Sequence, residues 1–422
     1  MVETFRNAWR VEELRKKILY TLMMLLIYRL GGIIPTPFVD TNVIRAAVEN
    51  MSVLNMINFI NGQNFSNFTI FAMGVQPYIT SSIVMQLLTV AIPVLERWQK
   101  EGEEGRKRIA QITRYVTVAL GALMAVGIIL SFGPSAFVSK APGALEYSVV
   151  FIALAAGTAF TMWIGERITE NGIGNGISLL IFVGIIASFP GQIGNAIQAI
   201  QLNPSSAWFA PVAIAGIVLL VVGIVFVDEA QRRIPVQYAK RMVGRRMYGG
   251  QATHIPIKVN SAGVMPLIFA ISIIQTPAIV ASFMPQSAFA AWYGRWMSTG
   301  SWLYMLLFAL MIVFFTYFYS TFTFNAPEIS KNLQQNGGFV PGIRPGRPTG
   351  DYLQKISNRI TFFGAIFLAV VATVPSIVLV LTGSSSPFTA TGILIVISVA
   401  LETTKQLEAQ MMMRHYKGFM KQ

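Results

Sequence analysis

Long apolar segments recur along the whole chain, and they constrain its fold more than any other feature. Ten can be drawn, at about 18–34, 68–93, 112–133, 147–166, 177–200, 209–227, 261–283, 302–324, 357–382 and 388–404. A helix of about 20 apolar residues crosses the hydrocarbon core of a bilayer. Because that core offers no hydrogen-bond partners to open backbone groups, these segments should be helices. The sequence therefore predicts an all-α integral membrane protein with ten transmembrane helices.

The distribution of Lys and Arg tests this assignment. The net charge of +14 is compatible with nucleic-acid binding, with an anionic lipid surface, or with the cytoplasmic excess of basic residues in membrane proteins. Of the 32 Lys and Arg, 28 lie in one alternating set of ends and loops, at 1–17, 96–114, 167–176, 228–260, 325–359 and 405–422. The positive-inside rule then places both termini and all the basic loops in the cytoplasm. This asymmetry explains most of the charge without a nucleic acid.

Two groups of five spans would have opposite orientations, as in inverted-repeat transporters. The predicted architecture is two inverted five-helix halves, an N-terminal half at 1–200 and a C-terminal half at 201–422. Between the first two spans, residues 53–60 form a short apolar stretch rich in asparagine. It is too short to span, so a re-entrant helix and an exterior cap helix are both compatible with it.

The spans lack the residues that pumping chemistry needs. Acidic side chains lie at span ends, as Glu166, Asp228 and Glu402 do, and the chain has no cysteine. Proton relays and ion-coupled transporters need ionisable groups inside the helix bundle. The sequence also contains no phosphate-binding glycine loop and no metal-ligand cluster. We therefore expect no catalytic residue, no cofactor and no metal, and we expect a partner to supply the energy for any directional work.

Uncharged polar residues at helical spacing mark the second and seventh segments. Small and hydroxylated residues often hold transmembrane helices together. The other interpretation is a helix interface that must open, because weak polar contacts separate more easily than an apolar seam. Pro77 and Pro277 each remove a backbone hydrogen bond and permit a bend.

Four motifs, in order along the chain, resemble those of the SecY family of the bacterial Sec protein translocon. They are FAMGVQPYI with QLL (71–79 and 86–88), GERITENGIGNGIS (165–178), QRRIPVQYAKR (231–241) and NGGFVPGIRPG (336–346). The resemblance covers about residues 15 to 415. It implies an hourglass pore that conducts unfolded preproteins across the bacterial plasma membrane.

The resemblance also implies roles for individual residues. A ring of aliphatic side chains closes the family's pore at mid-membrane, and the matching residues are Val75, Ile79, Ile181, Ile185, Ile268 and Ile395. The short stretch at about 53–66 corresponds to the plug that blocks the exterior funnel, with apolar residues Val53, Leu54, Met56, Ile57, Phe59 and Ile60. For any single ring residue, ordinary helix packing is the alternative.

Segments two and three, facing seven and eight, correspond to the family's lateral gate, through which signal sequences and transmembrane segments reach membrane lipid. Gln86, Ser272 and Gln275 are candidates for its polar contacts. The cytoplasmic loops at 96–111, 228–260 and 325–356 are expected to face the motor, and Arg344 occupies the family's critical arginine position. The remaining candidates for docking are Arg232, Arg233, Lys240, Arg241, Arg245 and Arg246.

The expected partners follow from the family. SecE would clamp the two halves, SecG would be an accessory subunit, and either the SecA ATPase or the translating ribosome would supply direction. The basic loops suit ribosomal RNA or an acidic protein face, although they also serve to set topology. The rival function is an inverted-repeat secondary transporter for a small solute, which would need a midplane binding site.

Overall fold

The computed structural model describes most of the chain. The described residues are 2–50, 58, 61–139, 141–202, 209–238, 241–243, 246–248, 252–283, 287–297, 301–382 and 390–419. The expected plug residues Val53, Leu54, Met56, Ile57, Phe59 and Ile60 lie outside the described residues.

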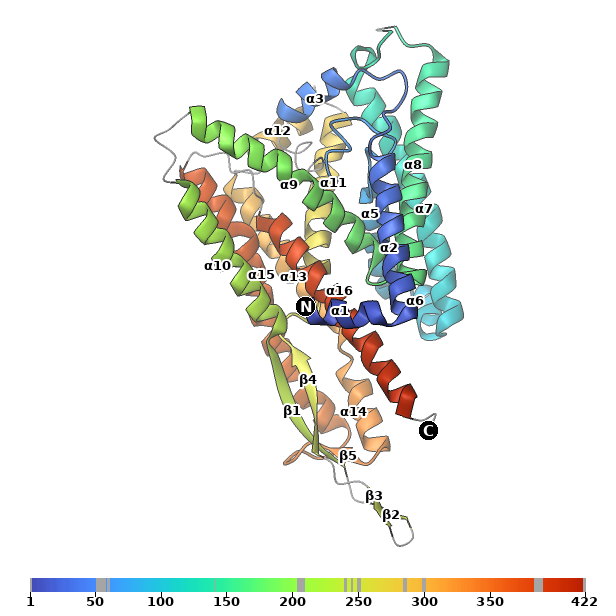
Figure 1. Cartoon of the computed structure of the whole chain (residues 1–422), viewed down its shortest axis with the longest axis vertical. Coiled ribbons are helices and arrows are strands. Elements are labelled where there is room, and N and C mark those ends of the chain that lie inside the picture. The colour runs from blue at the N-terminus through green and yellow to red at the C-terminus, as the bar shows by residue number, and fades with distance from the viewer. Residues whose placement is uncertain are drawn as a thin grey trace.

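Helices make up most of the described chain, and most of the long ones run roughly along the long axis of the molecule (Figure 1). In the first half they are α1 (Val2–Arg10), α2 (Glu12–Gly31), α3 (Thr41–Asn50), α5 (Gln76–Ala91), α6 (Pro93–Lys100), α7 (Glu103–Phe132), α8 (Ala144–Asn171) and α9 (Gly176–Leu202). In the second half they are α10 (Phe209–Glu229), α11 (Met265–Phe283), α12 (Ala288–Trp296), α13 (Trp302–Thr323), α14 (Ala326–Gln335), α15 (Arg347–Thr382) and α16 (Ala390–Phe419). A short 3₁₀ turn, η1 (Pro134–Ala136), follows α7.

Each of the ten apolar segments contains one of these helices. By length and composition, five helices in the described chain can cross a bilayer, and a sixth if α5 and α6, bent by 98°, form one broken span. The outward faces are apolar, with large exposed side chains such as Leu22, Leu123, Leu219 and Phe363. Such a surface is unfavourable in water and suited to lipid. The chain is therefore a multi-pass membrane protein, while the count of ten spans stays a prediction.

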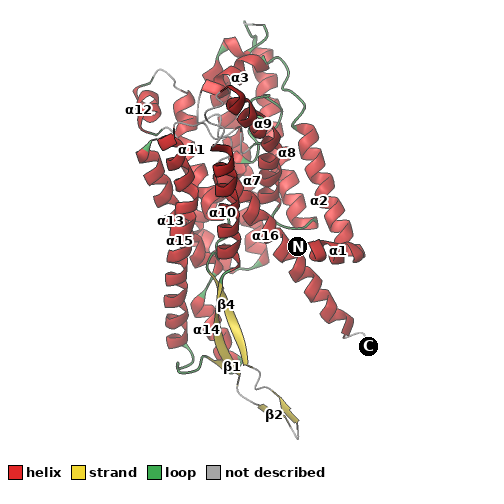
Figure 2. Cartoon of the chain, turned by 60° about the vertical axis from the view of Figure 1, so that its left-hand side comes forward, coloured by secondary structure: helices red, strands yellow, loops and turns green. Residues whose placement is uncertain are grey.

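The two ends of the bundle differ in structure and charge. One end has the β-sheet, α14 and the nearby termini, whereas α3 and α12 lie at the opposite end in both views (Figure 2). The basic loops belong to the sheet end, and the few basic residues at the other end include Arg45 in α3 and Arg295 in α12. This separation agrees with the alternation of charge along the sequence.

The two large basic loops join into one module. Strands β1 (Gln231–Tyr238), β4 (Ala252–Lys258) and β5 (Gly338–Phe339) form an antiparallel sheet in the order β4-β1-β5, and β2 (Arg241–Val243) pairs with β3 (Arg246–Tyr248) in a separate hairpin. Side chains from both loops and from the start of α15 share one apolar core, whose buried members are Ile234, Val236, Ile257, Ala326, Leu333, Val340 and Leu353. The loops at 228–260 and 325–356 are therefore a single folded unit.

The second apolar segment departs from the expected helix over 68–93. Residues 61–75 form consecutive turns, and α5 begins only at Gln76. Gly74 has φ of +54°, a backbone conformation unfavourable for other residues, and Pro77 stands in the first turn of α5. The apolar run therefore contains a buried turn segment followed by a shorter helix.

The shared core of the loop module predicts that damage in one loop should loosen the other. Leu353 is fully buried, so Leu353→Ala should cost about 3 kcal/mol of local stability. That change corresponds to a roughly hundredfold increase in the opened population, which proteases cleave. Limited proteolysis should then cut faster within 228–260. Tyr352→Ala, at the half-exposed neighbour, is the control, and unchanged cleavage in Leu353→Ala would contradict a common core.

Candidate functional site

The six ring candidates all belong to one large buried apolar cluster of the bundle, which has 34 buried members among the described residues. They come from four helices and from the turn just before α5, and their exposed fractions lie between 0% and 6%. Val75 and Ile79 are one helical turn apart, as are Ile181 and Ile185 on α9, while Ile268 lies on α11 and Ile395 on α16. All six are therefore buried members of the same apolar core, and their arrangement as a ring stays a prediction.

Close backbone contacts position this cluster. A Cβ atom at Gly157 of α8 would clash with the carbonyl oxygen of Ile70, so α8 packs directly against the turn segment that leads into α5. Gly62, with φ of +65°, approaches the backbone of Gly184 on α9 in the same way, and a Cβ atom there would lie 2.8 Å from the Gly184 oxygen. Larger side chains at these sites would push the turn segment away from the cluster.

Asparagine side chains hold the turn segment. Asn61 donates a hydrogen bond from Nδ2 to the carbonyl of Ala72 at 3.1 Å, and Asn64 Nδ2 lies 3.5 Å from the hydroxyl of Tyr28 on α2. Arg29, the charged residue of the first span, donates to the carbonyl of Gly62 at 3.3 Å. These contacts satisfy polar groups that lipid would leave unpaired.

The three candidates for the lateral gate do not form one hydrogen-bonded group. Ser272 and Gln275 are buried on α11, which contacts α5 and α7, whereas Gln86 on α5 lies 3.5 Å from Ser82 of its own helix. Both side-chain polar atoms of Gln275 are buried without a partner among the described residues. On α5 the same is true of Gln76 Nε2 and Thr80 Oγ1. The α5–α11 region therefore carries buried polar groups without hydrogen-bond partners among the described residues, and such groups contribute little to the stability of a helix contact.

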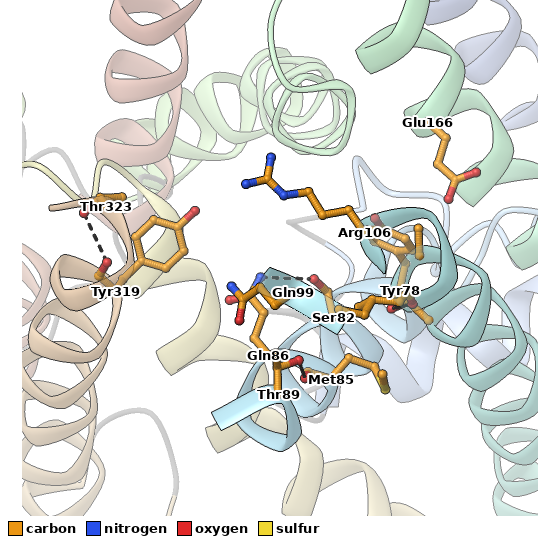
Figure 3. A pocket seen from close by; sticks show the side chains of 13 residues that line it. Tyr78, Ser82, Met85, Gln86, Thr89, Gln99, Arg106, Glu166, Tyr319 and Thr323 are labelled. Atoms are coloured by element: carbon orange, nitrogen blue, oxygen red, sulfur yellow. Dashed lines mark hydrogen bonds between the residues drawn. The ribbon is translucent and has the colours of Figure 1, made fainter. Parts of the chain in front are cut away.

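A cavity of about 390 Å³ opens beside this region, and Figure 3 shows its lining. Its walls come from α5, α6, α7, α8 and α13, with Tyr319 and Thr323 of α13 facing Gln86 and Arg106 across the space. Glu166 also lines it and forms an ion pair with Arg114 at 2.8 Å, which links α7 to α8. No sequence pattern marks Tyr319 or Arg106, because the cavity forms only when distant helices meet.

Arg344 lies at an exposed loop tip with a well-defined backbone. Gly342 and Gly346 on either side have φ of +82° and +92°. Thr349 Oγ1 donates to the carbonyl of Arg344 at 2.8 Å, and Ser330 Oγ of α14 donates to the carbonyl of Gly346 at 2.6 Å. The guanidinium group is thus presented outward from a braced loop.

The other basic candidates lie on the same module. Arg232 and Arg233 are exposed on β1. Arg241 and Arg246 belong to the β2–β3 hairpin, and Lys240 and Arg245 lie outside the described residues.

A polar network joins this module to α16. The carboxylate of Asp228, at the end of α10, accepts hydrogen bonds from Asn260 Nδ2 at 2.6 Å and from Ser398 Oγ at 2.9 Å. Lys405 donates to the backbone carbonyl of Asp228 at 3.1 Å. Ser398 lies less than one turn from Ile395, so the network connects the base of the sheet to a helix of the apolar cluster.

These features define a multi-pass helical membrane protein with a buried aliphatic cluster between its helices and a basic module at one end. The family model described as SecY matches residues 69–404, and the chain belongs to the SecY family. Protein translocase subunit SecY of Streptomyces scabiei is 42% identical, and that of Bacillus licheniformis 43% identical, with 100% of both chains covered in each case.

Solved structures share the fold. One described as "The structure of a protein conducting channel" matches with a TM-score of 0.68 at 19% identity, covering 94% of this chain and 92% of the other. Another, described as "Sec61 in the Canine ribosome-channel complex from the endoplasmic reticulum", matches with a TM-score of 0.63 at 17% identity and the same coverage.

Gln275 provides a test of the buried polar interface. Replacing an unpaired buried amide with an apolar side chain of similar size removes a desolvation penalty of about 1–3 kcal/mol. Gln275→Leu should therefore raise the thermal unfolding temperature of the purified chain. Gln335→Leu, at an exposed position in α14, is the matched control and should have no such effect. A lowered unfolding temperature in Gln275→Leu would show that the amide is paired.

Proposed function

We propose that the chain is the central channel of a protein translocase and conducts unfolded polypeptides through the apolar cluster. The observation that carries this proposal is that six aliphatic side chains, from four helices and one turn, are all buried members of a single apolar core. The relatives named protein translocase subunit SecY and the neighbour described as a protein conducting channel support it.

The chemistry of the cluster suits such a channel. Aliphatic side chains form no strong bond with ions or water, so a constriction made of them is closed by dewetting. The same side chains part around a passing chain because they hold it only weakly. No catalytic residue is required, and the channel acts without being an enzyme.

The proposed gate lies between α5 and α7 on one side and α11 and α13 on the other. Residues 1–200 and 201–422 form the two five-helix halves of a ten-span bundle, and this gate separates them. The amide of Gln275, which has no partner in the described part of the chain, and the polar lining of the adjacent cavity make this contact weaker than an apolar seam. Signal sequences and transmembrane segments would leave here for the lipid.

The basic module is the proposed docking site for the energy source. Exposed Arg344, Arg232 and Arg233 suit an acidic protein face, as on the SecA ATPase, or ribosomal RNA. Structural neighbours described in complex with ribosomes support the ribosome as a partner. SecE and SecG complete the proposed complex, in a bacterial plasma membrane with both termini in the cytoplasm.

Arg344→Glu tests the channel and its docking loop together. With the chain and SecE in liposomes, SecA, ATP and a secretory preprotein should give protease-protected preprotein. A reversed charge costs about 2–5 kcal/mol when the partner charge is buried, so protection should fall roughly tenfold or more. Arg347→Glu, an exposed arginine three residues further on, is the control.

Failure of the parent chain to protect preprotein, with SecA active on another channel, would contradict the proposed function. Uptake of a small solute in the same liposomes would instead favour the inverted-repeat transporter. Equal loss in both arginine variants would remove the specific role of Arg344.

The apolar ring predicts a seal that one polar substitution should weaken. Ile185 is 0% exposed, whereas its neighbour Ile186 is 40% exposed and faces away from the cluster. Ile185→Ser should let water wet the constriction and raise ion leakage across liposomes. Ile186→Ser should leave the leakage at the parent level. Equal leakage in the two variants would exclude Ile185 from the seal.

A further inference from the structure

The helix α12 (Ala288–Trp296) presents an aromatic face that the described protein does not cover. Phe289, Trp292 and Trp296 are 43%, 51% and 41% exposed. Their spacing of three and four residues places them on one side of the helix. The rings of Phe289 and Trp292 stack with their centroids 6.4 Å apart. Trp302, the first residue of α13, is also exposed.

The neighbouring face of α12 is fixed to the bundle. Tyr293 and Met297 are buried, and the Tyr293 hydroxyl donates to the carbonyl of Ile274 on α11 at 2.9 Å. Ser287 caps the helix by accepting a hydrogen bond from the Ala290 N–H at 3.1 Å. These contacts fix the orientation of α12. The aromatic face therefore points away from the bundle, and no described part of the chain packs over it.

A single positive charge borders the aromatic face. Arg295 is exposed, and within the described part of the chain its guanidinium has no ion pair or hydrogen bond. On a helical projection it lies about 60° from Trp292 on the side away from Tyr293. Ala291 and Gly294 occupy the opposite, exposed side and contribute no apolar bulk.

The position of α12 identifies what covers this face. The helix follows α11 and precedes α13, two apolar helices of the bundle, and lies at the end away from the sheet (Figure 2). Tryptophan rings concentrate where the acyl chains of a bilayer meet its headgroups. Amphipathic helices with aromatic residues on one side and a basic residue beside them lie in that plane.

We propose that α12 lies in the membrane interface with Phe289, Trp292 and Trp296 in the lipid and Arg295 paired with a phospholipid phosphate. The long arginine side chain reaches the phosphate level while the rings remain among the upper acyl chains. Since Tyr293 joins α12 to α11, the lipid surface then holds the end of a proposed gate helix. This proposal requires only that the protein is folded in a membrane, and it does not rest on the proposed translocation function.

Spin labels test the placement. Because the chain has no cysteine, a single introduced cysteine is the only site that the label modifies. Trp292→Cys and Trp296→Cys report on the proposed lipid face, and Ala291→Cys and Gly294→Cys on the opposite face. A Cβ atom at Gly294 meets no atom within 4 Å, so that control fits. Each variant carries a nitroxide, is reconstituted in phospholipid vesicles, and must keep the parent's unfolding temperature in detergent.

The measurement is the collision of each nitroxide with oxygen, which enters lipid, and with a nickel chelate, which stays in water. The oxygen-to-nickel ratio should be severalfold higher at 292 and 296 than at 291 and 294. Equal ratios at all four sites would place α12 in water and overturn the proposal. Exclusion of both reagents at 292 and 296 would mean that protein covers the face, which would overturn it as well.

Arg295 is tested with the label at position 292. Arg295→Glu should lower the oxygen-to-nickel ratio severalfold, because a carboxylate is repelled by the phosphate and favours water. Arg295→Lys keeps the positive charge and should retain the parent ratio. An unchanged ratio in Arg295→Glu would overturn the phosphate contact.

Discussion

Inside a bilayer no water is available to a backbone N–H or C=O group, so each must find its partner within the protein. Most of this chain meets that requirement with helices. The turn segment 61–75 meets it differently, because it is buried against α8 and α9 and is held by its own asparagines and by the 33–36 segment. The backbone N–H of Ile70 donates to Ile34, and the N–H of Thr36 donates to Phe68.

The proposed constriction follows from this exception. A continuous helix through 68–93 would orient Val75 and Ile79 as part of one long span. The turn shortens the helix and places Val75 immediately before its first residue, in the same buried core as aliphatic side chains of α9, α11 and α16. The polar groups nearby are satisfied by one another or left buried without a described partner, as in Gln275. Basic residues concentrate at one end of the helix bundle, on the β-sheet module, which has an apolar core of its own.

Much of the helical fold could be predicted from the sequence, because apolar length alone locates a transmembrane helix. The turn segment at 61–75 could not be predicted, since an apolar sequence does not show whether its backbone forms a helix or a series of buried turns. The sheet is not predicted from the sequence, because β1 pairs with β4 across a basic loop and with the two-residue strand β5, which lies about a hundred residues further along the chain. The exposed position of Arg344 agreed with its motif, whereas the role of each ring isoleucine came from the family resemblance alone. The plug residues stay a prediction.

The central claim is that the aliphatic cluster is the path of a translocating polypeptide. It is tested most directly by arresting a preprotein, carrying one cysteine, inside the reconstituted channel. Single cysteines at positions 79, 185, 268 and 395 of the chain should each form a disulfide with the arrested polypeptide, while a cysteine at 186 should not. Protease-protected preprotein without any of these cross-links would show that the polypeptide takes another route and would contradict the account.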